Sequence, residues 1–266
     1  MGDKTRLKEN NFSIVFIGTS SGKTSLKRFH SSLLIKSKSF NLLVDCGDGT
    51  SKALLAHDID LSSIDGILFS HLHPDHSSGF PSIIVQMKQL KRKKPLKVFC
   101  HANLTNSLKI FLKYSFVFTE RATFKLEYHG FEHEEKIKIS PNFKFASKHN
   151  SHLDKYLKYL EDKTGFACSS FLFELGKKKV LYSGDVSSVQ DLYLFEKENP
   201  ESVITEAAHI SWEEILEYDK KMKPEKIYLT HYSDELGKEL KRKAALLPAK
   251  ISKKIILAAD GLSIDF

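Results

Sequence analysis

The densest set of potential metal ligands lies in the stretch Gly66–Pro81, GILFSHLHPDHSSGFP, and this stretch constrains the fold more than any other. Its apolar start, Ile67–Phe69, is typical of the end of a buried strand. Imidazole nitrogen and carboxylate oxygen, which follow at high density, both suit a borderline cation such as zinc. Adjacent side chains point apart, so two neighbouring cations can use all of them where one cannot. The stretch predicts a two-metal centre with the ligands His71, His73, Asp75 and His76.

The length and composition of the chain set limits on the fold around this centre. With 266 residues and 41% hydrophobic content, the chain can bury one substantial core. This predicts a single α/β domain over residues 1–266. The net charge of +8, from 41 basic and 33 acidic residues, favours an anionic partner or substrate.

The cysteines and the apolar runs predict a cytoplasmic protein without membrane association. Cys46, Cys100 and Cys168 are odd in number and lie in apolar surroundings, which is typical of free buried thiols in a reducing compartment. The N-terminal sequence MGDKTRLKENN is polar and lacks the apolar run of a secretory signal. No apolar run approaches the roughly 18 residues of a membrane span.

The segment Gly18–Thr24, GTSSGKT, resembles a phosphate-binding loop without matching it. It follows a predicted strand, Phe12–Ile17, as such a loop would. The motif requires four residues between its first glycine and Gly-Lys-Thr, whereas here only Thr19–Ser21 intervene. We interpret the segment as a Gly-Ser turn leading toward the metal site, and not as a nucleoside triphosphate site.

The same order of predicted elements occurs twice along the chain. Hairpins are expected for Ser31–Lys36 with Asn41–Asp45 and for Cys168–Leu175 with Lys179–Tyr182, and strand–helix units follow each. Two mixed sheets packed face to face, with helices outside, account for this order. Helices are expected over Ser51–His57, Gly79–Leu90, Ala102–Tyr114, Leu153–Asp162 and Trp212–Met222. Other strands are expected over Leu96–Cys100, Phe124–Tyr128, Lys136–Ile139, Asn142–Ser147, Val203–Thr205, Ile227–Thr230, Ile255–Ala258 and Leu262–Phe266.

The H-x-H-x-D-H form of the central stretch resembles the metallo-β-lactamase superfamily. Other landmarks follow the order found in the ribonuclease Z branch of that superfamily. The resemblance implies the αββα four-layer sandwich, a mixed α/β fold. The landmarks are Phe16–Gly22 (FIGTSSG), Asp45–Thr50 (DCGDGT), Ser183–Asp185 (SGD), Thr205–Ser211 (TEAAHIS) and Leu229–Ser233 (LTHYS).

The resemblance also implies how the ligands divide between two zinc ions, for which manganese or iron are alternatives. The first cation is expected on two histidines of the central stretch and a third from residues 143–152. The second is expected on the other two side chains of the stretch and a late histidine, and one aspartate bridges the cations. The implied ligands are His71, His73, Asp75, His76, either His149 or His152, Asp185 and His231.

Two assignments stay open. His149 and His152 are both available as the middle histidine, and we slightly favour His152 because it follows a full strand, FKFASKHN. Asp45 is expected beside the metal loop, where it would orient the loop or a ligand by hydrogen bonds. An ordinary strand-end carboxylate explains Asp45 almost as well.

Two cations about 3.5–4 Å apart can share a water and lower its pKa toward neutrality, so a metal-bridging hydroxide is the expected nucleophile of a hydrolase. His209 resembles the ribonuclease Z histidine that protonates the leaving oxygen, and Glu206 would orient it. The alternative for His209 is a capping role before the helix at Trp212. The expected catalytic residues are Asp75, Glu206 and His209.

Departures from the ribonuclease Z pattern argue against tRNA processing. Thr24–Phe29, TSLKRF, lacks the usual proline and asparagine, and Asp234 and Glu235 replace the usual arginine region after His231. The expected function is a dinuclear metal phosphodiesterase acting on an anionic small molecule, such as a cyclic nucleotide, or on a nucleic acid. A lactonase or other ester hydrolase on the same fold is the alternative, and a non-hydrolytic binding or redox module is a third option. A homodimer is one expected assembly.

Overall fold

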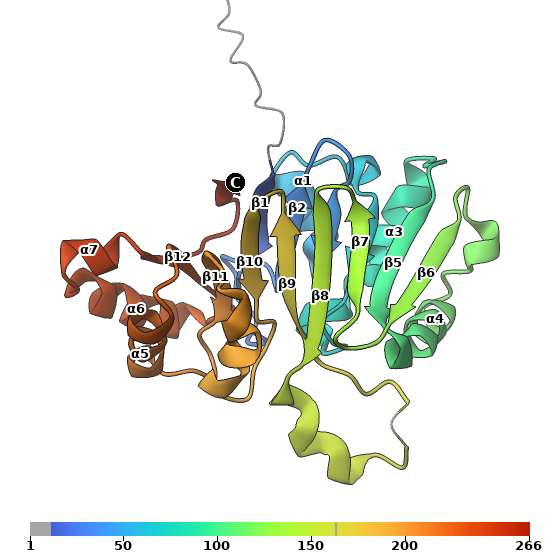
Figure 1. Cartoon of the computed structure of the whole chain (residues 1–266). Helices are drawn as coiled ribbons and strands as arrows, with labels where there is room; N and C mark the ends of the chain where they lie inside the picture. The colour runs from blue at the N-terminus through green and yellow to red at the C-terminus, as the bar shows by residue number, and fades with distance from the viewer. Residues whose placement is uncertain (1–11, 163) are drawn as a thin grey trace, which may run out of the picture.

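The computed structural model describes residues 12–162 and 164–266, whose strands form two seven-stranded sheets (Figure 1). The first sheet contains β1 (Ser13–Gly18), β2 (Ser32–Lys36), β3 (Leu42–Val44), β4 (Gly66–Leu68), β5 (Leu96–His101), β6 (Leu126–Phe131) and β14 (Ser263–Asp265). The second contains β7 (Lys136–Ser140), β8 (Phe143–His149), β9 (Ser169–Leu175), β10 (Lys178–Tyr182), β11 (Ser202–Glu206), β12 (Lys226–Thr230) and β13 (Ile255–Leu257). Their orders are β14-β1-β2-β3-β4-β5-β6 and β13-β12-β11-β10-β9-β8-β7.

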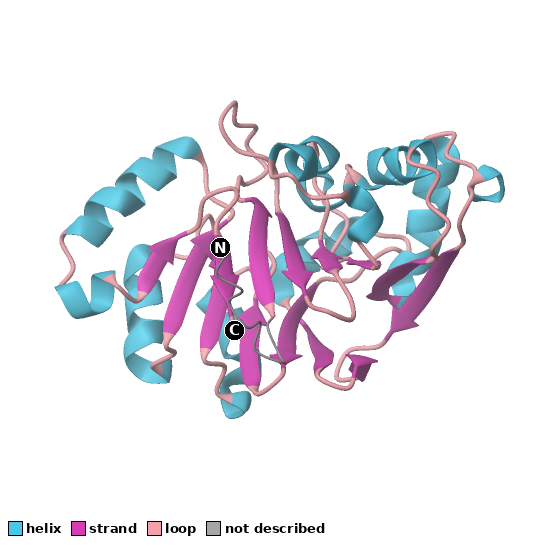
Figure 2. Ribbon diagram, turned by 90° about the horizontal axis from the view of Figure 1, so that it is seen from above, coloured by secondary structure: helices cyan, strands magenta, loops and turns pink. Residues whose placement is uncertain are grey.

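Helices cover the outer faces of both sheets, so the predicted αββα layers are confirmed (Figure 2). Apolar side chains fill three layers of core, one between the sheets and one under each helical layer. The first sheet carries α1 (Thr50–Ala56), α3 (Phe80–Gln89) and α4 (Thr105–Tyr114), and the second carries the 3-10 helix η5 (Val189–Glu198), α5 (Trp212–Met222) and α6 (Asp234–Ala245). Shorter helical segments are η1 (Leu61–Ser63), α2 (Pro74–Ser77), η2 (Ala102–Leu104), η3 (Thr119–Arg121), η4 (Ser151–Tyr159) and α7 (Ala249–Ser252).

Each half of the chain begins with antiparallel strands and continues with parallel ones, as the order of strand and helix signals predicts. β1 to β3 are antiparallel, and β3 to β6 are parallel. β7 to β10 are antiparallel, and β10 to β13 are parallel. The two predicted hairpins are the pairs β2–β3 and β9–β10. The last strand, β14, returns to the first sheet and pairs with β1.

Two predicted elements differ most from the structure in their bounds. The helix expected over Leu153–Asp162 is the 3-10 helix η4, which begins two residues earlier. It buries only two of its nine residues, too little apolar surface to stabilise a regular α-helix. The strand expected over Phe124–Tyr128 is β6, which begins at Leu126 and reaches Phe131.

The helices η5 and α6 were not among the predicted elements. Each begins at a serine whose side chain accepts a hydrogen bond from a backbone N–H two or three residues later. Ser188 accepts from Gln190, and Ser233 accepts from Leu236. Serine at this position is a common start signal of a helix, so the sequence did contain a sign of both.

The expectations drawn from composition have mixed outcomes. Cys46, Cys100 and Cys168 are free and buried, as predicted, and burial raises the thiol pKa of each above its ordinary value. Over 12–162 and 164–266, no helix is long and apolar enough to cross a bilayer. The polar N-terminal segment lies outside the described residues. Gly18–Thr24 does not lead into a helix, which agrees with its interpretation as a turn.

The strand directions bring several chain segments to one edge of the sandwich. β8 and β10 are both antiparallel to β9 and therefore run in the same direction, and β10, β11 and β12 are parallel. The carboxyl ends of β8, β10, β11 and β12 therefore lie on one side of the sheet. β3 of the other sheet ends there too, because Asp45, directly after β3, accepts a hydrogen bond from Tyr182, the last residue of β10. The segment after β8 projects from this lower edge in Figure 1.

Candidate metal centre

The structure brings seven of the predicted ligands together at this edge. They form two groups of four residues that share Asp185, and in each group the potential ligand atoms lie within 4.8 Å of one another. The shared aspartate corresponds to the bridging ligand that the resemblance implied. The groups are His71, His73, His152 and Asp185, and Asp75, His76, Asp185 and His231.

The two carboxylate oxygens of Asp185 face different groups. Oδ2 lies 3.7 Å from Nε2 of His152, which is itself 3.3 Å from Nδ1 of His73. Oδ1 lies 3.0 Å from Nε2 of His76 and 3.4 Å from Nε2 of His231. The carboxylate therefore stands between two sets of imidazoles.

A change of backbone conformation in the central stretch sends its ligands in two directions. His71 and His73 follow β4 in non-helical chain, with ψ of 146° at His73. Pro74 then starts α2, where its fixed φ suits the first helical position. Asp75 and His76 lie on this helical turn and contribute to the second group, whereas the two preceding histidines contribute to the first.

Two glycines let other segments come close to this loop. A Cβ at Gly47 would lie 2.0 Å from the carbonyl oxygen of Asp75, so a side chain there would push the DCGDGT turn away from the metal loop. Gly184 has a φ of +59°, a conformation that glycine adopts without strain. It lies in the turn between β10 and Asp185. The glycines of the DCGDGT and SGD landmarks thus have a physical role at the site.

Asp45 orients two of the ligands through hydrogen bonds. Its Oδ2 accepts the Nδ1 proton of His76 at 2.9 Å and the hydroxyl proton of Tyr182 at 2.9 Å. The hydroxyl of Ser70 donates to the same carboxylate at 2.7 Å and lies 3.0 Å from Nδ1 of His71. With Nδ1 engaged in both histidines, Nε2 of each is the nitrogen free to bind a metal.

The buried polar atoms of the two groups fit cations. Three of the atoms that face these groups have no hydrogen-bond partner in the described parts of the chain: Nε2 of His71, Nε2 of His76 and Oδ1 of Asp185. A buried polar atom without a partner is unfavourable, and several in one place are typical of an ion-binding site. Imidazole and carboxylate together suit zinc, manganese or iron.

The protonation states of His71 and Asp185 suit metal binding, whereas that of His76 differs. Burial lowers the pKa of His71 well below its ordinary value, so this imidazole stays neutral. Burial opposes ionisation of Asp185, but His231 and His76 outweigh it and hold the pKa of this carboxyl well below its ordinary value. Neutral imidazole and ionised carboxylate are the forms that bind metal. Burial opposes the charged form of His76, but Asp185 and Asp45 outweigh burial and raise its pKa, so a metal that binds there displaces a proton.

Of the two candidates for the middle histidine, only His152 lies in a ligand group. It is buried, whereas the side chain of His149 is 42% exposed and pairs with Asp154 at 3.1 Å. The separation follows from β8, whose final residue is His149. Asn150 caps the next turn by accepting the backbone N–H of His152, and this turn directs His152 toward the metal loop.

His209 lies beside both groups without belonging to either. Its ring centroid is 5.2 Å from that of His152 and 6.4 Å from that of His231. Nδ1 bonds Oε1 of the buried Glu206 at 2.7 Å, and this hydrogen bond raises the pKa of His209. The segment does cap the helix at Trp212, as the alternative expected, and it does so through Ser211, which forms a full capping box, and not through the side chain of His209.

Sequence reasoning missed several neighbours of the ligands. Ser70 and Tyr182 hold Asp45, and each directly precedes a recognised landmark, a position that could have indicated them. Tyr156 was also missed. Its ring packs edge-on against His73, with centroids 5.9 Å apart, and nothing in the sequence around it indicates this contact.

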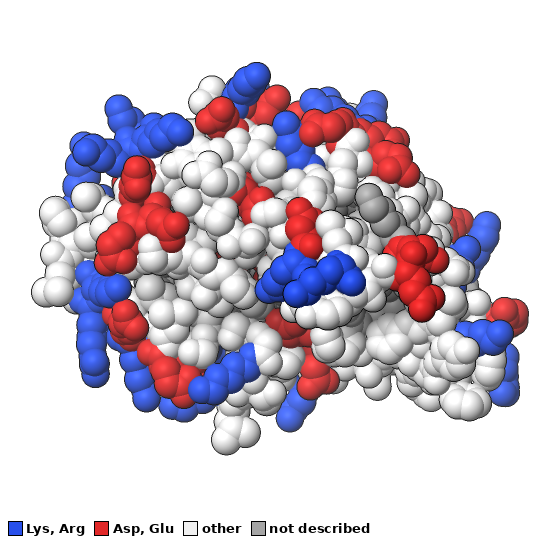
Figure 3. Space-filling view, turned by 90° about the horizontal axis from the view of Figure 1, so that it is seen from below, with Lys and Arg blue, Asp and Glu red and all other residues white. Residues whose placement is uncertain are grey.

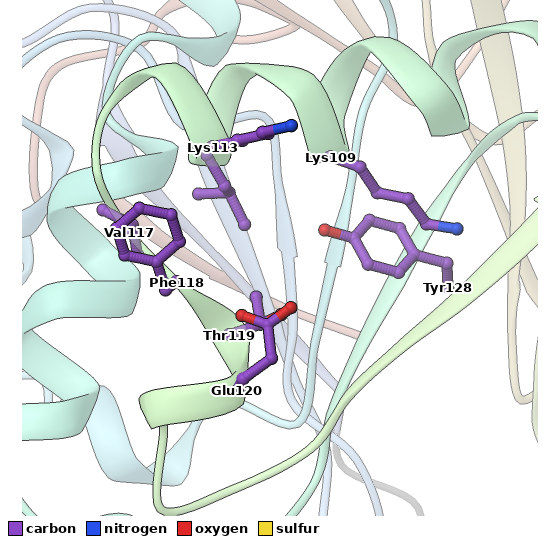
Figure 4. Close-up of a pocket in the computed structure, with 8 residues that line it drawn as sticks. Lys109, Lys113, Val117, Phe118, Thr119, Glu120 and Tyr128 are labelled. Carbon is purple, nitrogen blue, oxygen red and sulfur yellow. The ribbon is translucent and has the colours of Figure 1, made fainter.

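Two cavities differ in their relation to the site. One of about 370 Å³ is mostly apolar and adjoins the metal loop through Leu72 and Pro74, with Leu108 and Phe111 of α4 opposite. Another of about 360 Å³ lies between α4 and β6, where Lys109 stands over the ring of Tyr128 (Figure 4). This second cavity is lined by none of the predicted site residues.

Comparisons with known proteins agree with the geometry. A family model described as Anti-Pycsar protein Apyc1 matches residues 12–253. The anti-Pycsar protein Apyc1 of Bacillus phage BSP38 is 31% identical over 250 residues, which cover 84% of this chain and 90% of the phage protein. Ribonuclease Z of Saccharolobus solfataricus is 35% identical over 128 residues, 48% of this chain and 43% of that protein.

A solved structure supports the fold. The metallo-beta-lactamase fold protein YhfI from Bacillus subtilis has a TM-score of 0.73 to this chain. The superposition covers 97% of this chain and 100% of YhfI, at 19% sequence identity. The similarity at this identity concerns the fold, and the metallo-β-lactamase sandwich that the sequence motifs implied is confirmed.

Proposed function

The chain belongs to the Anti-Pycsar protein Apyc1 family, and from this premise we propose that it is a phosphodiesterase that hydrolyses cyclic nucleotides. It is a metal-dependent hydrolase with a metallo-β-lactamase fold, and the name of its relatives suggests degradation of cyclic nucleotides. The observation that carries the proposal is the pair of ligand groups sharing Asp185, with His209 beside them.

Each ligand group would hold one cation, with Asp185 contributing to both. Two such cations, when bound, supply an acidified water and positive charge that stabilises the negative charge of the transition state. The chain's own residues then fix the geometry. Asp45 holds His76 directly and His71 through Ser70, so the metal-facing nitrogens are set before substrate binds.

His209 is suited to protonate the leaving oxygen. Hydroxide adds to phosphorus, the bond to the leaving oxygen breaks, and this oxygen takes a proton from protonated His209, which becomes neutral. Because Nδ1 bonds Glu206, Nε2 is the nitrogen available for the transfer. Glu206 is itself held by the backbone N–H groups of Ala208 and Val186, which keeps the pair in one orientation.

Charge pairing near the site favours a small substrate over tRNA. Asp234 binds Arg28 at 3.0 Å, and Arg28 also donates to the backbone carbonyl of Tyr232. Glu235 pairs with Lys23 at 3.1 Å. The acidic pair that replaces the usual arginine region is therefore bound to Arg28 and Lys23, and these two cations are engaged within the protein.

The test is a substrate screen of the purified protein after metal analysis. We expect hydrolysis of cyclic nucleotides and of aryl phosphodiesters, loss of activity with a chelator, and recovery when metal is added back. Pre-tRNA should not be cleaved. Hydrolysis of lactones with no cleavage of any phosphodiester would contradict the proposal.

Lactone or ester hydrolysis is the second candidate, and two observations favour it. Tyr156 lies beside His73, where its hydroxyl could hydrogen-bond a carbonyl oxygen. The apolar cavity lined by Leu72 and Phe111 adjoins the metal loop and could take an acyl chain. A lactonase of this kind depends on the phenol hydroxyl, so Tyr156→Phe should then abolish lactone hydrolysis.

A further inference from the structure

The segment that follows β8 has a fixed base at the metal centre and an exposed outer part. Ser151 donates its hydroxyl proton to Asp191 at 2.9 Å, and the side-chain amide of Asn150 donates to the carbonyl oxygen of Ser183 at 3.2 Å. Beyond this base, the side chains of η4 become exposed, and the segment projects below both sheets (Figure 1). An anchored base gives the outer residues a defined position relative to the metal ligands.

Tyr156 is the aromatic residue of this segment that reaches the metal centre. Its ring meets that of His73 edge-on, at 81° and 5.9 Å between centroids. It is nevertheless 39% exposed, so part of the ring is open to solvent beside a predicted ligand. The next side chain, Leu157, lines a different cavity with His149 and His101. Only one side of the segment therefore faces the metal centre.

Lys155 adds a positive charge on the same side. Its Nζ lies 5.2 Å from the centroid of the Tyr156 ring. Burial is the main cause that lowers the pKa of His152, and the charge of Lys155 adds to it. The same charge opposes the Glu206 hydrogen bond that raises the pKa of His209. The ammonium group is thus within electrostatic reach of His152 and His209.

We propose that Tyr156 is a stacking platform for the base of a nucleotide whose phosphate lies at the metal groups, and that Lys155 attracts this phosphate. The inference rests on the proposed function in taking a nucleotide as the ligand. Stacking on an aromatic ring tolerates any base, because every base has a π face. The face of the molecule that carries the segment is largely uncharged near its middle, apart from a small group of basic side chains with a few acidic ones (Figure 3).

Equilibrium binding measurements test the stacking role of Tyr156 without catalytic turnover. The metal-loaded protein is titrated calorimetrically with AMP, with CMP and with inorganic phosphate. Both nucleotides should bind more tightly than phosphate, and Tyr156→Ala should weaken nucleotide binding about tenfold to a hundredfold while leaving phosphate binding and metal content unchanged. Tyr156→Phe keeps the ring and should bind as the wild type does. Lys155→Met should weaken both nucleotide and phosphate binding, most strongly at low salt.

The chain offers a matched control one step further along the segment. Lys158 stands over the ring of Tyr159 at 4.9 Å, so this pair repeats the lysine–tyrosine arrangement, and Tyr159 is 72% exposed. Tyr159→Ala should leave every affinity unchanged. Equal weakening of nucleotide and phosphate by Tyr156→Ala, or loss of metal, would overturn the proposal and assign the ring to support of His73. So would a wild-type protein with no preference for nucleotide over phosphate.

The failure of this inference can be told apart from failure of the proposed function. If AMP binding depends on Tyr156 but no cyclic nucleotide is hydrolysed, the phosphodiesterase proposal fails and the stacking site stands. If cyclic nucleotides are hydrolysed and Tyr156→Ala leaves their KM unchanged, the stacking site is wrong. A small diester, methyl p-nitrophenyl phosphate, provides the matching kinetic control, because it has no base and its KM should not respond to Tyr156→Ala.

Discussion

Oδ2 of Asp45 accepts the Nδ1 proton of His76 at 2.9 Å, and both side chains are fully buried. The carboxylate fixes which nitrogen of the imidazole faces the metal and strengthens that nitrogen as a ligand. Asp45→Asn replaces the charge with an amide of the same shape. We expect the variant to bind metal about 10–100-fold more weakly, measured by competition with a chromogenic chelator.

Asp65 provides the control for this prediction. It too is a buried carboxylate, but it accepts the backbone N–H of Asn41 and pairs with Lys94, and it contacts none of the ligands. Asp65→Asn should therefore leave metal affinity unchanged, even where it lowers stability. Equal losses of affinity in both variants would show that Asp45 acts through general stability.

The choice between His152 and His149 can be settled by a pair of substitutions. His152→Ala removes a buried member of the first group and should abolish activity and metal binding there. His149→Ala removes an exposed partner of Asp154 and should keep both. Metal analysis of the two purified variants decides the question. The reverse result would make His149 the ligand, and two small effects would mean that another residue completes the group.

Metal stoichiometry tests the division of ligands. We predict about two equivalents of zinc, manganese or iron per chain in the wild type, because there are two ligand groups. Asp75→Ala should lose much of one equivalent, since Asp75 belongs to one group only. Asp185→Ala should reduce both. Asp48→Ala, in the exposed turn beside the site, is the control and should keep the full content. Wild-type protein without transition metal would contradict the whole assignment.

The ligands close together in sequence could be predicted, because a dense local motif needs no knowledge of the fold. His71 and His73 lie before the start of α2, Asp75 and His76 lie within it, and each pair falls in one of the two ligand groups. Asp185 and His231 are isolated in sequence, and only the ordered landmarks of the superfamily assigned them. The layers could be predicted as well, since alternation of hairpins and strand–helix units leaves few arrangements of two sheets.

Contacts between distant segments could not be predicted. Tyr182 reaches Asp45 across 137 positions of the chain, through the meeting of two sheets whose register no local pattern reveals. Tyr156 lies in η4, where little burial leaves no periodic signal. For the same reason the helix predicted over Leu153–Asp162 had the wrong bounds, since η4 begins at Ser151 and ends at Tyr159. Ser70, Tyr182 and Tyr156 therefore came only from the structure, whereas the orienting residues Asp45 and Glu206 were expected from the ordered landmarks.

His209→Ala should separate substrates by their leaving group. General-acid help is worth about 10²–10⁴-fold and matters most when the leaving alkoxide is strongly basic. A cyclic nucleotide should therefore lose most of its kcat, whereas an aryl diester that releases nitrophenolate should lose little. Metal content should not change, because His209 belongs to neither group. Equal losses on both substrates would indicate a structural or positioning role.

The pH dependence of the proton transfer from His209 to the leaving oxygen depends on Glu206. Its hydrogen bond to Nδ1 raises the pKa of His209, so the protonated acid persists to higher pH and is lost as the pH rises through that raised value. Glu206→Gln removes the negative charge and should lower the pKa of His209. The alkaline limb of kcat for a cyclic nucleotide should then move to lower pH, while the profile for a nitrophenyl diester should keep its position. Because Glu206 also lies 3.9 Å from Nδ1 of His231, metal content is measured alongside. An alkaline limb that stays in place in Glu206→Gln protein with full metal content would exclude His209 as the acid that sets it.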